Sequence, residues 1–288
     1  MTDKHDPYKA KDTGHVWDKN IRELDNPPPR WWIIGLHLSW ISILLYCILY
    51  PSIPLMKGST KGILGWTQIK EYKAQVAEVE AIRKPFNDQI ASMTTENILK
   101  ETQLLNFAQA SARATFKTFC ASCHGAGGQG GPDFPVLADD DWLYGGSMDD
   151  ITQSIAWGRI GDMPAHKEML TEQEMDDVVQ YVMGLSKGQS HKAGEKVFMG
   201  KSKKRQARCY TCHGRDAKGK QSKGAPDLTD EIWRFNGSEE AIRHTIVYGV
   251  NYGGTPTRKA RMPAFGEKLD KITIKKLALL VHQFGGGQ

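Results

Sequence analysis

The longest apolar stretch of the chain runs from Trp31 to Tyr50 and contains no Lys, Arg, Asp or Glu. As a helix this stretch would be about 30 Å long, which matches the hydrocarbon thickness of a bilayer. Aromatic residues stand at both of its ends, as they do at membrane–water interfaces, and Pro51 comes directly after it. The pattern therefore predicts one transmembrane helix at residues 31–50.

Mostly polar residues 1–30 precede this helix, and no small-residue cleavage site lies after it. These features predict an uncleaved anchor rather than a secretory signal peptide. Lys and Arg are equally frequent close to the two ends, so the flanking charges do not orient the helix. Within the helix we expect His37 to have a packing or hydrogen-bonding role, facing a partner rather than lipid.

The rest of the chain shows apolar residues at helical spacing, which predicts a mainly α protein. Within the connector at residues 51–106, residues 67–106 show this pattern with an interruption at Pro85, so we expect two helical pieces that connect the membrane helix to the C-terminal part of the chain. Further along, Thr171 and Glu174 have the spacing of a capping box ahead of an apolar helical face.

Residues 107–188 and 189–288 repeat the same landmarks and are predicted to be two domains. The interval from Trp142 to Trp157 equals that from Trp233 to Tyr248. Each block begins with a short helical segment, ends with a helical pattern, and contains a Met-Pro pair. The Met-Pro pairs are at Met163 and Met262.

Charge is distributed unevenly between the two blocks. The whole chain has a net charge of +5, which does not indicate a nucleic-acid partner, and a mean hydropathy of −0.48, which excludes a polytopic membrane protein. Residues 107–188 contain 5 Lys+Arg and 12 Asp+Glu, whereas residues 189–288 contain 20 and 9. The first domain is therefore acidic and the second basic, which suggests different partners.

Four of the five cysteines form two C-x-x-C-H motifs, the attachment pattern of c-type haem. Two thiols at this spacing reach the two haem vinyl groups, and the adjacent His binds the iron. A zinc ribbon would need two C-x-x-C pairs closer together, and a redox dithiol would not need the His. The motifs predict two covalently bound haem c groups. The predicted attachment residues are Cys120 and Cys123 for the first haem and Cys209 and Cys212 for the second, with His124 and His213 as iron ligands.

The sixth iron ligands are predicted to be Met163 and Met262. A thioether ligand raises the reduction potential and closes the iron to other ligands. His166 is a possible alternative because it follows Met163 by three residues, and the sequence leaves this choice open. Other histidines are weaker candidates, namely His191, His244 and His282.

The blocks resemble class I cytochrome c domains, in which the N- and C-terminal helices cross over a haem. The predicted fold is therefore one N-terminal transmembrane helix followed by two tandem domains of this class. The resemblance implies that the carbonyl groups of Pro132 and Pro226 accept the ring N–H of His124 and His213, which would fix the ligand orientation.

The segment from Gly14 to Trp32 closely resembles the region that precedes the membrane helix in the dihaem subunit of cbb3-type cytochrome c oxidases, the FixP/CcoP type. The resemblance covers residues 14 to about 285. It implies an electron-transfer subunit of a respiratory chain, with no catalytic residues of its own. Its implied partners are the catalytic haem–copper subunit, a monohaem cytochrome c subunit, a c-type cytochrome donor and inner-membrane lipid.

Haem c is attached on the outer face of the bacterial inner membrane. We therefore expect a cytoplasmic N-terminal segment, a periplasmic connector at residues 51–106 and two periplasmic haem domains. The main alternative is a free-standing, membrane-anchored dihaem cytochrome that serves another complex. A dihaem peroxidase is a second alternative, and it would need one iron without a sixth protein ligand.

Overall fold

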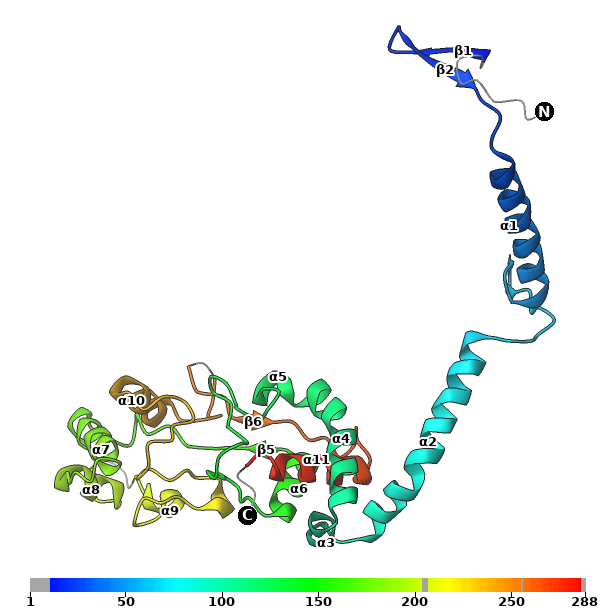
Figure 1. Ribbon diagram of the computed structural model, residues 1–288. Coiled ribbons are helices and arrows are strands. Elements are labelled where there is room, and N and C mark those ends of the chain that lie inside the picture. Colours follow the sequence, from blue (N-terminus) through cyan, green and yellow to red (C-terminus); the bar gives the residue numbers. More distant parts are fainter. Residues whose placement is uncertain (1–10, 204–206, 255, 286–288) are drawn as a thin grey trace. The chain divides into compact units, whose positions relative to one another are not determined.

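The computed structural model describes residues 11–203, 207–254 and 256–285 and divides the chain into two compact units, residues 1–82 and 83–288. Figure 1 shows the elements of both units. The fold is mostly helical, with one apolar N-terminal helix, as the sequence predicted. Lys204 and Arg205 of the basic second repeat lie outside the described residues.

The first unit begins with a hairpin that the sequence pattern did not predict. Strands β1 (Lys11–Trp17) and β2 (Ile21–Asp25) pair antiparallel. Asp18 and Lys19 both have positive φ angles, as the tight turn of a hairpin requires. A second short hairpin, β3 (Pro54–Leu55) with β4 (Gly58–Ser59), comes after the apolar helix.

Helix α1 (Arg30–Leu49) is the predicted membrane helix and contains no buried residue. Because its apolar side chains are exposed all round, the helix has no protein core to pack into within its own unit. His37 Nδ1 hydrogen-bonds to the carbonyl oxygen of Ile33 at 2.7 Å, so the ring satisfies a polar atom on its own helix. The expected hydrogen-bonding role of His37 is therefore met locally.

Helix α2 (Gln68–Ser92) continues through Pro85, so the prediction of two pieces in this region was wrong. Its C-terminal end belongs to the second unit and is held by the last helix of the chain, α11 (Lys271–His282). There Lys275 Nζ donates to the carbonyl groups of Ile90 and Met93, and Lys276 Nζ donates to Asn87 Oδ1. This part of the predicted connector is thus anchored in the haem-motif unit.

The remaining elements of the second unit are short helices joined by loops. The connector ends with α3 (Thr95–Lys100), and the first repeat is formed by α4 (Thr102–Phe119), α5 (Ala121–His124), α6 (Met148–Trp157), β5 (Arg159–Ile160) and α7 (Glu172–Leu185). The second repeat contains α8 (Lys192–Phe198), α9 (Tyr210–His213), the 3-10 turn η2 (Gln221–Lys223), α10 (Glu239–Tyr248), β6 (Arg261–Met262) and α11.

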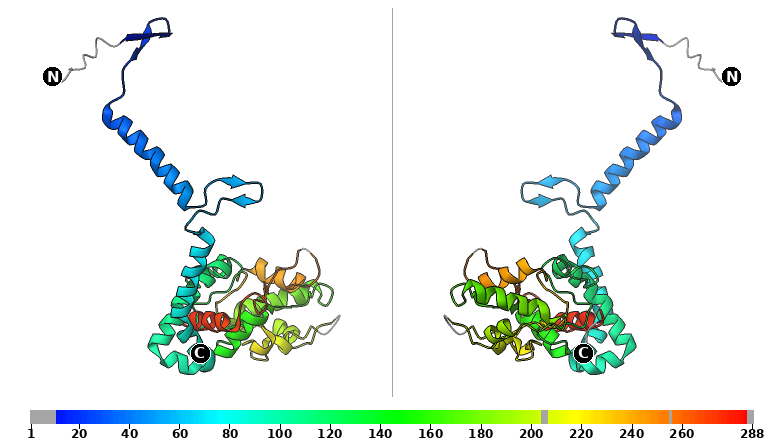
Figure 2. Two further views of the ribbon diagram at one scale, coloured as in Figure 1. Left: turned by 90° about the vertical axis from the view of Figure 1, so that its right-hand side faces the viewer. Right: turned by 90° about the vertical axis from the view of Figure 1, so that its left-hand side faces the viewer.

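The two hydrophobic cores each combine both repeats. We expected each repeat to close over a core of its own, with its first and last helices in contact. Instead α11 of the second repeat packs on α4 and α6, whereas α7 of the first repeat packs on α8 and α10. Figures 1 and 2 show α11 beside α4, and Figure 1 shows α7 beside α8. The boundary at residue 188 therefore separates the two sequence repeats, but each core contains residues from both sides of it.

Just after α6 and α10, the polypeptide segments of the two repeats cross, and each continues into the core of the other repeat. Here β5 and β6 pair antiparallel, with Arg159 opposite Met262. A matching contact joins Met163 and Val250, whose backbone groups exchange two hydrogen bonds of 2.9 and 3.1 Å. After this exchange, each repeat contributes its Met-Pro loop and its last helix to the core that the other repeat began.

Two equivalent glycines make the exchange possible. Gly158 and Gly249 end α6 and α10 with φ angles of 69° and 72°. A Cβ atom on Gly158 would overlap the carbonyl oxygen of Met262, and one on Gly249 would overlap that of Met163. Only glycine combines this backbone conformation with such a close approach of a second chain segment.

The predicted capping box at the start of α7 is confirmed. Thr171 accepts a hydrogen bond from the Glu174 backbone N–H, and the Glu174 carboxylate accepts one from the Thr171 backbone N–H. Glu174 also accepts from the Lys203 backbone N–H, so this cap connects α7 to the loop after α8.

Candidate haem-attachment sites

Each C-x-x-C-H motif forms a single helical turn, α5 in the first repeat and α9 in the second. All four motif thiols are free. Burial raises the pKa of Cys120 and of Cys209 to about 11. A redox-active or catalytic cysteine has a lowered pKa instead, so these thiols do not have the character of a dithiol redox centre.

The ring of each motif histidine is oriented by a backbone carbonyl group. His124 Nδ1 lies 3.0 Å from the carbonyl oxygen of Pro135, and His213 Nδ1 lies 3.2 Å from that of Pro226. Because a carbonyl oxygen can only accept, Nδ1 carries the proton and Nε2 keeps its lone pair for a metal. Burial also lowers the pKa of both rings, which favours the neutral form that binds iron.

The proline predicted for the first site was wrong: the acceptor is Pro135, not Pro132. The sequence comparison of the repeats matched the two Pro-Asp pairs, Pro132 with Pro226. The structure instead matches Pro135 with Pro226, because Leu137 donates to Gly128 as Leu228 donates to Ala217. In the first repeat the Pro-Asp pair forms a tight turn ahead of the acceptor, and this turn shifts the register.

Each of the two methionines packs against the core that contains the haem motif of the other repeat. Met262 is half-buried against the core that contains Cys120, and Met163 is half-buried against the core that contains Cys209. The exchange of chain segments therefore brings Met262 to the first motif and Met163 to the second. Each candidate haem site takes its Cys and His residues from one repeat and its Met from the other.

The structure separates the roles of Met163 and His166. His166 donates its backbone N–H to the Ile246 carbonyl group, as Phe265 donates to that of Ile155. His166 thus occupies the position of a buried aromatic residue, whereas Met163 occupies that of Met262. His166 is only 7% exposed, lies close enough to His213 to lower its pKa, and has no hydrogen-bond partner for Nδ1.

The other histidines have local roles. His191 Nδ1 accepts from the Gly194 backbone N–H and caps α8. His244 packs against Tyr248 within α10, with ring centroids 4.9 Å apart. His282 ends α11.

The residues gathered at each site fit haem c. Each site combines two thiols that can attach a haem with a neutral imidazole, whose Nε2 lone pair is available, and a thioether sulfur. The imidazole and the thioether are the two axial iron ligands of a six-coordinate cytochrome c. At the second site His166 Nδ1 is buried without a hydrogen-bond partner. In the described ranges no three His, Cys, Asp or Glu side chains converge in a way that could hold a metal ion.

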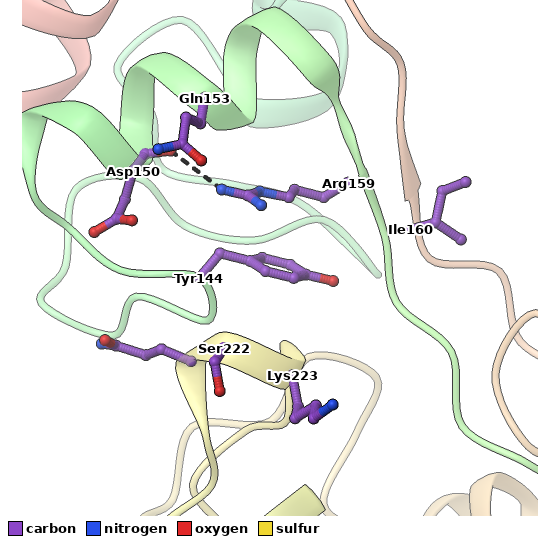
Figure 3. A pocket seen from close by; sticks show the side chains of 8 residues that line it. Tyr144, Asp150, Gln153, Arg159, Ile160, Ser222 and Lys223 are labelled. Carbon is purple, nitrogen blue, oxygen red and sulfur yellow. Dashed lines mark hydrogen bonds between the residues drawn. The ribbon is translucent and has the colours of Figure 1, made fainter.

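A polar pocket of about 560 Å³ lies between the repeats, away from the motif residues. Figure 3 shows Tyr144 between Arg159 above it and Ser222 and Lys223 below. The Arg159 guanidinium lies 4.7 Å from the centroid of the Tyr144 ring. The pocket contains no predicted haem ligand, and its residues instead form part of the contact between the two repeats.

Charge distinguishes the surfaces around the two motifs. Residues 118–158, which surround α5, contain no Lys or Arg and six Asp. The surface around α9 is basic, and Arg215 contacts the ring of Tyr210 there. The exposed cations of this surface are Arg208, Arg215, Lys218, Lys220 and Lys223.

Comparison with known proteins gives matches along the chain. Residues 9–57 match the family model described as "N-terminal domain of cytochrome oxidase-cbb3, FixP", and residues 107–182 and 199–281 match "Cytochrome C oxidase, cbb3-type, subunit III". The chain is 38% identical to the "Cbb3-type cytochrome c oxidase subunit FixP" of Rhizobium meliloti (strain 1021), with 100% of both chains covered. It is 38% identical to the CcoP subunit of Azospirillum sp. (strain B510), covering 96% of this chain and 95% of that one.

Proposed function

The chain belongs to the FixP/CcoP family of cbb3-type cytochrome c oxidase subunits, and from this premise we propose that it is the membrane-anchored dihaem subunit that delivers electrons to the oxidase. The single observation that carries the proposal is that two equivalent sites each assemble two thiols, an oriented imidazole and a thioether. Haem c, when bound, supplies one-electron redox chemistry at its iron.

The residues of this chain hold the haems and set their properties. Cys120 and Cys123 attach the first haem, and Cys209 and Cys212 attach the second. His124 and His213 bind the irons through Nε2, while the carbonyl groups of Pro135 and Pro226 keep each ring in one tautomer and orientation. Each site packs against one hydrophobic core.

The sixth ligands are exchanged between the repeats in this proposal. Met262 binds the iron held by His124, and Met163 binds the iron held by His213. The support is that each methionine packs in the core of the opposite motif. With a thioether on both irons, neither iron has an open position for oxygen, so the chain transfers electrons and oxygen is reduced in another subunit.

A ligand replacement tests this exchange. In Met262→His, we expect the weak red absorption band of methionine-ligated ferric haem to be halved and one reduction potential to fall. Cys120→Ser leaves one vinyl group on the first haem and shifts its absorption, which labels that haem. If the labelled haem loses its methionine in Met262→His and keeps it in Met163→His, the exchange is correct; the reverse result would mean that each repeat ligates its own haem.

We further propose that α1 crosses the inner membrane with its N-terminus in the cytoplasm, so that both haem sites are periplasmic. The support is chemical, because haem c is attached on that side. The partners in this position are the catalytic haem–copper subunit and the monohaem cytochrome c subunit, with a c-type cytochrome as donor.

Purification of the full chain from native membranes in a mild detergent tests the oxidase assignment. We expect haem b, copper and oxygen consumption to co-purify with two covalent haem c groups per chain. Recovery of haem c alone, with no larger partner, would support a free-standing anchored cytochrome instead.

A further inference from the structure

The chain folds back onto the C-terminal end of the apolar helix α1. The last four carbonyl groups of α1 all accept hydrogen bonds from residues 50–64. The donor–acceptor pairs are Tyr50 N–H to Tyr46, Ser52 Oγ to Cys47, Ile63 N–H to Ile48 and Leu64 N–H to Leu49. A helix end in water can leave such carbonyl groups to the solvent, whereas a helix end in an apolar surrounding needs partners from the protein.

Residues 52–64, the fold-back segment, are held together by their own hydrogen bonds. The Thr60 backbone N–H donates to the Ile53 carbonyl group, and Thr60 Oγ1 accepts from the Ile53 N–H. Gly62 has a φ angle of 64°, and a Cβ atom there would overlap the carbonyl oxygen of Leu49. Glycine therefore lets the segment lie directly against the end of α1.

The fold-back segment exposes large apolar side chains. Leu55 and Met56 are exposed at the tip of the β3–β4 hairpin. Ile63 and Leu64 are 77% and 56% exposed, although their backbone groups bond to the last turn of α1. Figure 2 shows the hairpin, in light blue, next to the end of α1. A cluster of this kind on a protein surface marks a contact with another apolar surface or phase.

The depth of these side chains follows from the hydrogen bonds. Ile63 and Leu64 lie at the level of the last turn of the membrane helix, because their N–H groups bond to carbonyl groups of that turn. At the same end, Tyr50 packs edge to face on Trp66, with ring centroids 5.5 Å apart. Tyr and Trp are the residues that membrane–water interfaces favour. The fold-back segment thus lies where the hydrocarbon region ends.

The charge of this region is complementary to a lipid surface. Residues 26–70 contain no Asp or Glu, and the fold-back segment contains two exposed cations, Lys57 and Lys61. We propose that the fold-back segment lies in the bilayer interface, with its four exposed apolar side chains among the lipid acyl chains and its two lysines at anionic headgroups. Lipid is therefore the occupant of this apolar surface, and the segment fixes the depth of α1.

The segment is also joined to the start of α2. Trp66 Nε1 donates to Glu71 Oε2, and Lys70 Nζ donates to the Gly65 carbonyl group, both at 2.9 Å. The first turn of α2 is thus bonded to the residues that follow the fold-back segment. An interfacial segment therefore also sets where the predicted connector leaves the membrane surface.

The inference rests on the proposed membrane crossing of α1, and its test uses the full haem-loaded chain in nanodiscs of phosphatidylglycerol and phosphatidylcholine. A Cys47→Ser background leaves no cysteine outside the haem motifs, so an added cysteine can carry a nitroxide label. In Met56→Cys we expect more collisions of the label with molecular oxygen than with a water-soluble nickel complex, as in Leu44→Cys within α1. The control is Asn20→Cys in the turn of the polar β1–β2 hairpin, where this ratio should be reversed.

The lysines are tested with the same label. Lys57→Gln with Lys61→Gln should raise the nickel collisions of the Met56→Cys label in discs with phosphatidylglycerol and not in discs of phosphatidylcholine alone. Lys19→Gln with Lys73→Gln removes the same charge at exposed positions outside the fold-back segment and should change neither. An equal effect of the two pairs would contradict the contact with anionic headgroups.

Photocrosslinking in native membranes separates lipid from a protein partner. A benzophenone amino acid at position 56 should give a lipid adduct, and a crosslink to protein would overturn the inference. The inference also fails if the Met56→Cys label collides more with nickel, or rarely with either probe, while the Leu44→Cys label reports lipid. A Leu44→Cys label in water would instead contradict the proposed membrane crossing. If Met56→Cys is not recovered with both haems, Ile63→Cys gives the same comparison at the other end of the segment.

Discussion

At the scale of single residues, a few positions where the two repeats meet determine how the repeats pack together. Gly158 and Gly249 have little chemical character, yet each lies against the Met-Pro backbone of the other repeat. Pro135 and Pro226 act through their carbonyl groups, which orient the imidazoles of the two motif histidines. In the proposed sites these residues position the ligands rather than bind the haems.

We predict that Gly158→Ala and Gly249→Ala each lower the free energy of unfolding by about 2 kcal/mol or more, because both the positive φ angle and the carbonyl contact are disturbed. Gly188→Ala is the control, since its φ angle is also positive and nothing lies within 4 Å of the added Cβ. Its cost should be about 1 kcal/mol. Thermal unfolding of the purified chain measures all three, and equal losses would contradict the role of the chain exchange.

The element scale concerns which helices pack together. Helices α7 and α11 end their repeats in the sequence, but α7 packs on α8 and α10 of the other repeat, and α11 packs on α4 and α6. Core residues such as Val178 in α7 and Leu277 in α11 are 1% exposed, so the contacts are complete rather than marginal. Each hydrophobic core is therefore built from helices of both repeats.

The capping box of α7 gives a prediction about the second site. Thr171→Ala should destabilise the chain by about 1 kcal/mol, because a capping hydrogen bond is lost. Through the contact of α7 with α8, thermal loss of the Met163 ligand should begin earlier than loss of the Met262 ligand. The exposed Glu172→Gln is the control, and simultaneous loss of both ligands in Thr171→Ala would contradict the assignment of α7 to the second site.

The same cap predicts a pH dependence. Burial alone would raise the pKa of Glu174, but hydrogen bonds from Thr171 and the Lys203 backbone lower it overall. A lowered folded-state pKa means that the stabilisation is fully present above the ordinary value of 4.5 and is lost as the pH falls below it. Glu174→Gln should therefore reduce the slope of unfolding free energy against pH below 4.5, as measured by denaturant titrations at several pH values.

For the whole molecule, the difference in charge between the two repeats bears on partner choice. The second motif is surrounded by exposed cations, whereas the segment around the first contains only Asp among its charged residues. Complementary charge increases the rate of encounter and is screened by salt. We therefore expect a donor with an acidic surface to dock near the second motif.

We predict that Lys218→Glu combined with Lys220→Glu slows reduction by an acidic c-type cytochrome about tenfold at low ionic strength. The control is Lys187→Glu with Lys192→Glu, which changes the charge equally at exposed positions outside the motif loop. Stopped-flow reduction rates measured against ionic strength would test this. A rate that is independent of salt in the wild-type chain would rule out steering by this surface.

Several features of this protein can be predicted from sequence alone because they are local. A C-x-x-C-H motif places its two thiols and its imidazole within one helical turn, and 20 residues without charge predict a membrane helix. The capping box at Thr171 also needs only neighbouring residues. Family-model matches to the same two blocks confirm the repeat.

Only the tertiary structure decided how the local pieces combine. The positions of Met163 and Met262 in the sequence do not show which motif each methionine serves. Two similar repeats bury similar surfaces whether each methionine serves its own repeat or the other one. The choice depends on contacts such as β5 with β6, between residues about a hundred positions apart. The identity of Pro135 as the hydrogen-bond acceptor for His124 also depended on the register of the loop rather than on sequence similarity between the repeats. The sequence thus determined the candidate haem residues, and long-range packing determined which of them lie at the same core.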